Sequence, residues 1–402
     1  MSEAIKTSDD MARRAKYLDE VRDMLFPHQG GATRSYIAVP NLRKPRVLIP
    51  AERSAASGAL QRYAWPATAS ARLKRNAAYW AVNSRLDRLL LRHRIDVPTT
   101  DGIDDYLSSA IGHPVLSAIH IGPARANRKP VLHLLDPEGN TVGFAKMGVN
   151  DLTRDLVRAE RDNLEVLQKR SWRNQLVLPE VAHFGHWRDF NILVTTPIPA
   201  WEPPTDHNHR RRIAAMVELT KAFSVTSGPL CQSGYRRRLD ERLELLATYP
   251  EEDARVLYQT AQTTLPRYAE VELEYGSWHG DWTPWNSRHS GEFIYLWDLE
   301  RYESDVPLGF DALHYRLQDA IVTEQRNPKT ALEELLRAAP ALLEPFNVTA
   351  TQARATAVLY IIDLAVRYAI DRAAEAGAAL GALGSWLLPA LIEYTHEGRQ
   401  HD

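Results

Sequence analysis

The chain has 402 residues, of which 44% are hydrophobic and 25% are charged, and its formal net charge is -2. This length predicts two or three compact units, and the composition is typical of a soluble globular protein. The balanced charge gives no indication of a nucleic-acid partner or of an anionic membrane surface. The runs Arg210-Arg211-Arg212 and Arg236-Arg237-Arg238 are short, and we interpret them as solvated helix faces.

Cys231 is the only cysteine, which excludes a disulfide framework and a cysteine-rich zinc site. A single thiol fits a reducing compartment, and the charged first residues do not resemble a signal peptide. The longest uncharged stretch near the C-terminus, residues 376–392, is short for a membrane span and contains glycine and proline. We therefore expect a cytoplasmic protein without a membrane partner.

Residues 1–105 are expected to form an N-terminal α/β extension. An amphipathic pattern predicts a helix over residues 8–25, and two short apolar runs predict strands at 36–39 and 47–49. Helical patterns then extend to residue 94, and the polar segment 96–105 indicates a domain boundary. This extension contains no motif with recognisable chemistry, so a packing role is the simplest interpretation. Substrate recognition and dimerisation remain alternatives.

Residues 106–199 change to a strand-rich pattern. Strands are expected near residues 115–121, 130–135 and 141–147, then a helix over 152–169 and further strands at 181–184 and 190–195. Residues 200–402 form a mainly helical third region, with helices expected near 312–324, 329–338, 350–374 and 378–394.

The residues most informative about chemistry lie within this helical region. The segment Ser277-Trp278-His279-Gly280-Asp281-Trp282-Thr283-Pro284-Trp285-Asn286 is followed, twelve residues after Asn286, by Asp298. Phosphoryl transfer to a hydroxyl requires a carboxylate that accepts the hydroxyl proton, together with oxygen ligands for Mg²⁺. Asp281 is a candidate for the first role. Asn286 and Asp298 are candidates for the second.

This pattern resembles the aminoglycoside phosphotransferase and choline kinase-like family over about residues 113–400. Protein kinases instead have Arg before the catalytic Asp and an Asp-Phe-Gly motif, where this chain has Gly280 and Asp298-Leu299-Glu300. The resemblance implies an α+β, bilobal protein kinase-like fold, with residues 106–199 as the small lobe and 200–402 as the helical lobe. It also implies that Asp311 anchors the catalytic loop.

Lys146 lies near the end of the third strand of the small lobe, where kinase-like folds place the lysine that contacts the nucleotide α- and β-phosphates. Glu160, on the following helix, is the candidate partner for this lysine, and Glu165 on the same helix is an alternative. The expected phosphate loop, residues 122–129, contains one glycine and no Gly-rich motif. Arg125, Arg128 and Lys129 could provide charge there instead, or they could be solvated.

The sequence therefore predicts a small-molecule kinase that uses ATP and Mg²⁺, with Asp281 catalytic, Lys146 and Glu160 at the nucleotide, and Asn286 and Asp298 at the metal. The acceptor is a hydroxyl of an amino sugar, aminoglycoside, sugar or similar compound. Glu270, Glu272 and Glu274 alternate along one face and could form a cation-attracting rim or a solvated surface. A protein kinase and a non-catalytic nucleotide-binding module are the alternative functions. Oligomeric state is left open.

Overall fold

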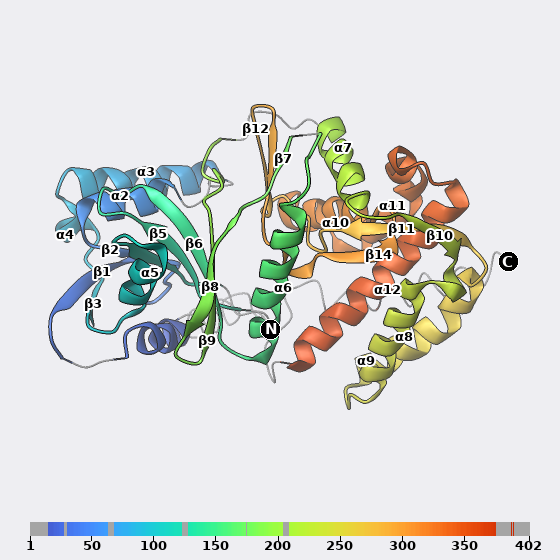
Figure 1. Ribbon diagram of the computed structural model, residues 1–402, viewed down its shortest axis with the longest axis horizontal. Helices are drawn as coiled ribbons and strands as arrows, with labels where there is room; N and C mark the ends of the chain where they lie inside the picture. The colour runs from blue at the N-terminus through green and yellow to red at the C-terminus, as the bar shows by residue number, and fades with distance from the viewer. Residues whose placement is uncertain are drawn as a thin grey trace. The chain divides into compact units, whose positions relative to one another are not determined.

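The computed structural model of the protein describes residues 15–27, 30–62, 68–122, 128–173, 175–203 and 209–374, together with residues 387 and 389. The chain forms two compact units (Figure 1). The first comprises Met1–Gln168 and Leu178–Thr205, and the second comprises Lys169–Val177 and Asp206–Asp402. Within the described ranges, no helix combines the length and the apolarity needed to cross a membrane.

An eight-stranded sheet forms the centre of the first unit, and every neighbouring pair of strands is antiparallel. In spatial order the strands are β3 (Arg94–Pro98), β1 (Thr33–Val39), β2 (Val47–Pro50), β4 (Leu116–His120), β5 (Val131–Leu135), β6 (Thr141–Gly148), β9 (Phe190–Thr195) and β8 (Val181–Trp187). The strands expected between residues 115 and 195 are thereby confirmed.

The N-terminal region is not a separate extension, and the boundary expected after residue 105 does not divide the compact units. Strands β1, β2 and β3 belong to the same sheet as the small-lobe strands, and β2 pairs with β4 through Leu48 and Ile119. The segment interpreted as a boundary contains the end of β3 and the start of α5 (Ile103–Ile111). Its polar sequence suits an edge strand, where Pro98 is tolerated because one side of the strand is unpaired.

Alternation along the strands gives the sheet two apolar faces. In β1, Tyr36 and Ala38 join one buried cluster, whereas Ile37 joins the other. The first cluster includes residues from the helical segment 15–25 and from α5. The second includes residues of α2 (Arg53–Gln61) and α3 (Ala69–Asn83), and the short α4 (Asp87–Leu90) follows α3. Helix α6 (Asp151–Leu167) packs on β6 and β9.

The second unit is mainly helical. Its helices are α7 (His209–Thr220), α8 (Gly234–Ala247), α9 (Glu252–Thr264), α10 (Phe310–Gln318), α11 (Pro328–Leu343) and α12 (Ala350–Ala374). Two three-stranded sheets accompany them: β10 (Thr226–Pro229), β11 (Glu272–Trp278) and β14 (Glu303–Pro307) form one, and β12 (Ser287–Ser290), β13 (Phe293–Leu296) and β7 (Leu176–Val177) form the other. Short helical turns are η1 (Leu230–Gln232), η2 (Leu265–Tyr268), η3 (Leu299–Arg301), η4 (Asp319–Thr323) and η5 (Glu344–Phe346).

The predicted fold class is confirmed in the make-up of the two units: a β-rich unit precedes a mainly helical one, and α6 follows the third strand of the predicted small lobe. The helix expected over residues 350–374 is observed with these bounds. Most of the helix expected over 378–394, and residues 123–127 of the expected phosphate loop, lie outside the described residues.

Candidate functional site

The loop that contains Asp281 begins at a rigid point of the second unit. Strand β11 ends at the buried Trp278, whose ring lies 5.2 Å from that of Phe310, at an interplanar angle of 80°. Phe310 opens α10, and the next residue, Asp311, accepts a hydrogen bond from the His279 N–H at 2.8 Å. This edge-to-face aromatic contact and the hydrogen bond fix the start of the loop to α10.

His279 connects the two ends of the candidate site. The Asp281 N–H donates to His279 Nδ1 at 3.1 Å, and His279 Nε2 lies 3.0 Å from the carbonyl oxygen of Trp297. Burial lowers the pKa of His279 to about 4, so the ring is neutral near pH 7. Because Nδ1 accepts, Nε2 carries the proton and donates to Trp297. His279 thus holds the Asp281 backbone against the residue that precedes Asp298.

Gly280 allows the loop to turn tightly. Its φ is +82°, and a Cβ atom at this position would lie 2.0 Å from the carbonyl oxygen of Arg301. Any side chain there would collide with this backbone, whereas glycine adopts a positive φ without cost. The half-buried guanidinium of Arg367, on α12, donates to the Gly280 carbonyl oxygen at 2.5 Å. The glycine that replaces the protein-kinase arginine therefore has a steric reason in this structure.

Two side chains hold the Asp281 carboxylate. Asn286 Nδ2 donates to one carboxylate oxygen at 2.8 Å, and His314 Nε2 lies 2.9 Å from the other. About a third of the Asp281 side chain is exposed to solvent, whereas His314 is fully buried. The carboxylate is thus fixed in orientation and remains accessible.

His314 was not identified from the sequence. Burial lowers its pKa, although the hydrogen bond and charge of Asp281 act to raise it. A neutral His314 that donates from Nε2 to Asp281 accepts at Nδ1 from the hydroxyl of Tyr360, 2.9 Å away. The signal that could have revealed it is its spacing: it follows Asp311 by three residues, so one turn of α10 directs both side chains to the same loop.

Asn286 and Asp298 lie at the two open ends of the β12–β13 hairpin. The Trp297 N–H donates to the Asn286 carbonyl oxygen at 3.1 Å, which places Asp298 one residue beyond this pair. Asp298 has a left-handed backbone, with φ 70° and ψ 50°, and precedes η3. Such a conformation is uncommon outside glycine and is frequent at functional sites.

The chemistry of these two side chains suits a hard cation. Both hydrogen bonds of the Asn286 side chain seen among the described residues use Nδ2, so its Oδ1 remains a possible ligand. Asp298 provides a carboxylate, and Mg²⁺ prefers such oxygen donors, usually one or two per protein site with phosphates and water as the others. Asn286 and Asp298 therefore have the donor atoms that Mg²⁺ prefers, and their roles as metal ligands remain predictions.

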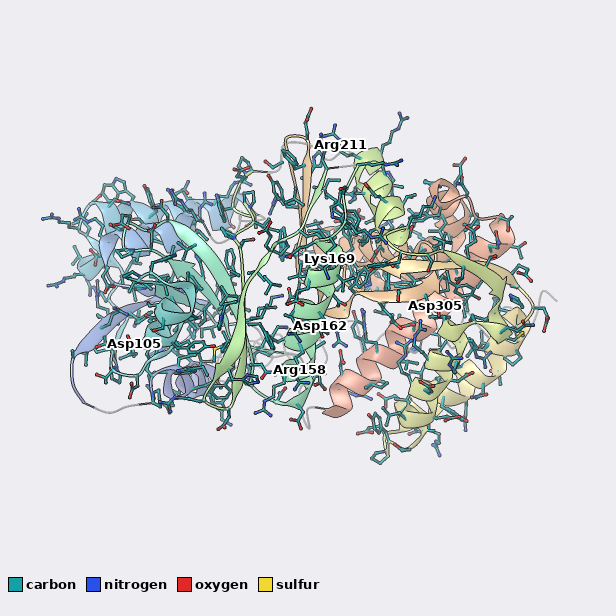
Figure 2. The ribbon with its side chains drawn as sticks, in the orientation of Figure 1. Asp105, Arg158, Asp162, Lys169, Arg211 and Asp305 are labelled. Atoms are coloured by element: carbon teal, nitrogen blue, oxygen red, sulfur yellow. The ribbon has the colours of Figure 1, made fainter. Side chains whose placement is uncertain are left out.

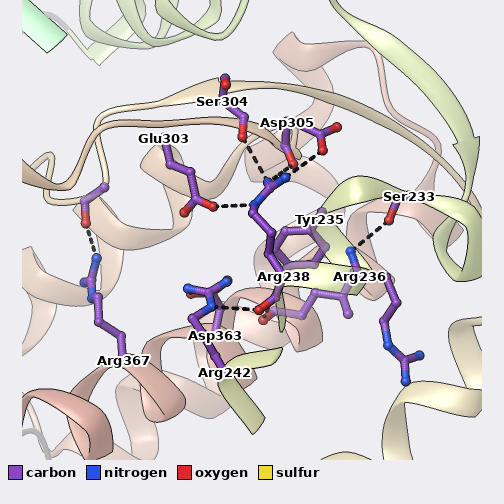
Figure 3. A network of polar contacts seen from close by, with 12 residues as sticks. Ser233, Tyr235, Arg236, Arg238, Arg242, Glu303, Ser304, Asp305, Asp363 and Arg367 are labelled. Atoms are coloured by element: carbon purple, nitrogen blue, oxygen red, sulfur yellow. Dashed lines mark hydrogen bonds and ion pairs between the residues drawn. The ribbon is translucent and has the colours of Figure 1, made fainter. Parts of the chain in front are cut away.

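A polar network supports the loop from the side of α8 and α12 (Figure 3). Arg242 pairs with the buried Asp363 at 3.0 Å, and Arg238 bonds Glu303 at 2.8 Å and Asp305 at 2.9 Å. A cavity of about 280 Å³ lies beside these groups and is lined also by Glu300 and Arg367. Most carboxylates that line this cavity form salt bridges with a guanidinium, so the cavity is not strongly negative.

The acidic residues before the loop do not form a rim around it. Strand β11 starts at Glu272, six residues before Trp278, which corresponds to roughly 20 Å of extended chain. Glu272 is exposed, Glu274 is half-buried, and Glu270 contacts Cys231. The interpretation as a solvated surface is the better one.

The other predicted pair lies in the first unit. Lys146 Nζ, on β6, lies 2.7 and 2.6 Å from the two carboxylate oxygens of Glu160 on α6. Glu160 is 1% exposed and Lys146 15%. Helix α6 starts close to the end of β6. A Cβ atom at Gly148 would lie 2.6 Å from the Arg154 Cα, so glycine permits α6 to approach β6.

The position of Glu160 along α6 explains why it pairs with Lys146. It lies in the buried stripe of the helix, whose other members are Thr153, Leu156, Val157, Leu164 and Leu167. Glu165, the alternative from the sequence, is exposed. Arg158 and Asp162, labelled in Figure 2, are also largely exposed on this helix, with 49% and 59% of their side chains accessible.

No protein-family model and no curated protein matches the chain. Solved structures are similar to it at low identity. For the choline kinase of Streptococcus pneumoniae the identity is 15% over 73% of this chain and 98% of that one, with a TM-score of 0.49. For an amicoumacin kinase in complex with AMP-PNP and Ca²⁺, the identity is 14% over 67% of this chain and 86% of that one, with a TM-score of 0.45. For an aminoglycoside phosphotransferase mutant in complex with ADP and hygromycin B, the identity is 10% over 74% of this chain and 98% of that one, with a TM-score of 0.45.

Proposed function

We propose that the protein is a phosphotransferase that moves the γ-phosphate of ATP to a hydroxyl of a small molecule. The observation that carries this proposal is the Asp281 carboxylate, which is accessible and held by Asn286 and His314. A fixed carboxylate of this kind is suited to orient a hydroxyl and to accept its proton.

The remaining predicted residues have roles consistent with this reaction. Lys146, held extended by Glu160, contacts the α- and β-phosphates of the nucleotide. Asn286 and Asp298 hold Mg²⁺, which supplies charge neutralisation of the phosphates when bound. Asp281 takes the proton of the acceptor hydroxyl and keeps its oxygen directed at the γ-phosphate. Arg367, Asp311 and His279 fix the loop so that little reorganisation accompanies the reaction.

The experiment that tests this proposal separates the base from the metal ligand. Asp281→Asn should retain Mg²⁺-dependent ATP binding and lose turnover by roughly 10²–10⁴-fold, the usual effect of a missing general base. Asp298→Asn keeps a residue type that tolerates the left-handed backbone but removes a negative ligand, so it should weaken nucleotide binding itself.

Thermal melts with ATP, in Mg²⁺ and in a chelator, provide the measurement. At about 100 times its dissociation constant, ATP should stabilise the wild type by roughly 2.7 kcal/mol. Asp281→Asn should keep most of this gain, and Asp298→Asn should lose much of it. A full shift in both variants would contradict the assignment of Asp298. ATP binding by the wild type without phosphate transfer to any hydroxyl compound in a broad screen would support a non-catalytic module.

A further inference from the structure

A cavity of about 730 Å³ in the second unit does not include any residue of the candidate active site. Residues 170–173, helix α7 and Pro345 line this cavity, which we call the α7 groove. Its lining includes five apolar residues that are buried or half-buried and that we call the floor: Trp172, Ile213, Ala214, Val217 and Ala222. A groove of this size with an apolar floor is large enough for a small organic ligand.

Positive charge surrounds this floor. Arg173, Arg210 and Lys221 line the groove, and within the described ranges no carboxylate forms a salt bridge with any of them. Arg170 also lines it and lies with its guanidinium 4.7 Å from the Phe223 ring. This concentration of cations occurs in a chain whose net charge is -2.

Among the described residues that line the groove, the single acidic side chain is that of Glu218. Glu218 accepts a hydrogen bond from the backbone N–H of Arg173, which ties it to the loop that forms one wall. Its negative charge offsets one of the four cations, Arg170, Arg173, Arg210 and Lys221, that line the groove.

Helix α7 explains how the sequence builds the groove. Ala215, Met216 and Leu219 are fully buried and attach the helix to the core of the unit. The opposite stripe of the helix, Arg210, Ala214 and Val217, has helical spacing, and Lys221 follows directly after the end of α7. The Arg210-Arg211-Arg212 run is thus divided: Arg211 donates to the Gly291 carbonyl oxygen, Arg212 lies over the Tyr315 ring, and Arg210 faces the groove.

We propose that the α7 groove binds a small organic anion with an aromatic or aliphatic body. The apolar part lies on the floor beside Trp172, and a carboxylate, sulfonate or phosphate lies between the cations of the rim. Burial of the apolar part of the ligand contributes affinity. The cations of the rim favour an anionic ligand through electrostatic attraction. This site is independent of the phosphotransferase function proposed above.

The test uses 8-anilinonaphthalene-1-sulfonate, a fluorescent aromatic anion, with the full chain. One molecule should bind per chain, and the double variant Arg173→Gln/Lys221→Gln should weaken binding at least tenfold. Ala214→Trp, which fills the floor and retains the cations, should also weaken it tenfold or more. Arg255→Gln, an exposed arginine of α9 outside the groove, is the matched control and should bind as the wild type does. Circular dichroism and melting confirm that each variant is folded.

Two further measurements distinguish the groove from other sites. The dye should bind Asp298→Asn as it binds the wild type, because the groove contains none of the residues assigned to the nucleotide or the metal. The uncharged N-phenyl-1-naphthylamine should respond to Ala214→Trp but not to the charge variant. Weaker dye binding by Asp298→Asn, or unchanged dye binding in either groove variant, would overturn the proposal.

Discussion

At the residue scale, buried groups determine how the polar side chains of the candidate site are presented. The charged Asp281 is set by two neutral donors, and one of these, His314, is itself fixed by Tyr360. This chain of hydrogen bonds starts in the core of the helical unit and ends at an accessible carboxylate. A hydrogen bond to a charged group contributes about 1.5–3 kcal/mol. Loss of His314 is therefore expected to lower turnover, although its side chain is fully buried.

We predict that His314→Phe lowers turnover by roughly 10–100-fold, which is the kinetic equivalent of one charge-assisted hydrogen bond. His314→Gln keeps a donor of similar reach and should recover part of this loss. Mg²⁺–ATP binding should be unchanged in both variants, since Asp281 is not assigned to the metal. ADP production with an accepted substrate, measured beside ATP-dependent melting, checks the prediction. Equal turnover of the Phe and Gln variants would show that His314 has only a packing role.

A second residue-scale prediction concerns the Lys146–Glu160 pair. Removing one member of a buried pair leaves an uncompensated charge and costs about 3–5 kcal/mol, whereas replacing both by apolar residues is often nearly neutral. Lys146→Ala should therefore lower both stability and nucleotide affinity. The double variant Lys146→Met/Glu160→Leu should recover stability but not affinity. Urea unfolding and ATP titrations separate the two effects. Wild-type ATP affinity in the double variant would exclude Lys146 from the nucleotide site.

At the element scale, the candidate loop depends on four segments, of which β11 leads directly into it and the other three follow it in the sequence. Strand β11 delivers His279, α10 provides Asp311 and His314, α12 provides Arg367, and η3 presents its backbone to Gly280. Each segment is regular and well packed, whereas the loop between them is irregular. The loop therefore owes its conformation to these contacts more than to its own sequence.

Gly280→Ala is the most direct test of this arrangement. The new methyl group would lie 2.0 Å from the Arg301 carbonyl oxygen, so the loop must shift, at a cost of roughly 1–3 kcal/mol in addition to backbone strain. Gly291→Ala is the matched control, because Gly291 also has a positive φ, of 58°, but a Cβ atom there would meet no atom within 4 Å. Comparing the two free energies of unfolding isolates the steric term. Similar losses in both variants would argue against the close approach of Arg301.

At the scale of the whole molecule, strands β1, β2 and β3 and helix α5 are bound together with β4 by buried polar contacts as well as by strand pairing. Asp104 accepts hydrogen bonds from Arg34 Nη1 at 2.8 Å, from Ser117 Oγ at 2.5 Å and from the Tyr36 hydroxyl at 3.3 Å. These residues belong to α5, β1 and β4. Burial raises the pKa of Asp104 to about 6. Without the N-terminal strands, β4 would become an exposed edge.

Buried histidines make the stability of the fold dependent on pH. His133, stacked on Phe144 at 5.0 Å, has its pKa lowered to about 3 by burial, compared with 6.5 when unfolded. The folded state therefore keeps a neutral ring, and its contribution to stability is fully present above pH 6.5 and is lost as the pH falls toward 3. Between pH 8 and pH 5 this loss is about 2 kcal/mol.

His133→Phe removes this titration and preserves the ring stacking. Relative to the variant, the wild type should become less stable by about 2 kcal/mol from pH 8 to pH 5. Urea unfolding at several pH values measures the difference in stability between the two proteins. The raised pKa of Asp104 favours the folded state at low pH, but this effect is the same in both proteins and cancels in the difference. Parallel stability curves for the two proteins would show that His133 is accessible to protons in the folded state.

The sequence alone determined those features that depend on local pattern. Alternating and helical periodicities located the strands β4, β5, β6, β8 and β9 and the helix over residues 350–374, because each pattern reflects burial on one side of an element. The spacing of Asp281, Asn286 and Asp298 predicts a phosphotransferase site because the chemistry requires those groups in a short loop and at a strand end, and this assignment stays a prediction. Glu160 lay in the apolar stripe of α6, so its burial could be inferred from spacing.

Only the tertiary structure decided which distant residues meet. The N-terminal strands joined the main sheet because hydrogen-bonded pairing is not encoded in any one strand, and β3 was missed because its polar edge has no apolar run. His314 is separated from Asp281 by 33 residues, and Arg367 from Gly280 by 87, yet both side chains reach the loop from helices. A neutral buried histidine becomes a determinant of the site only where folding places it against a carboxylate, and no local pattern specifies that contact.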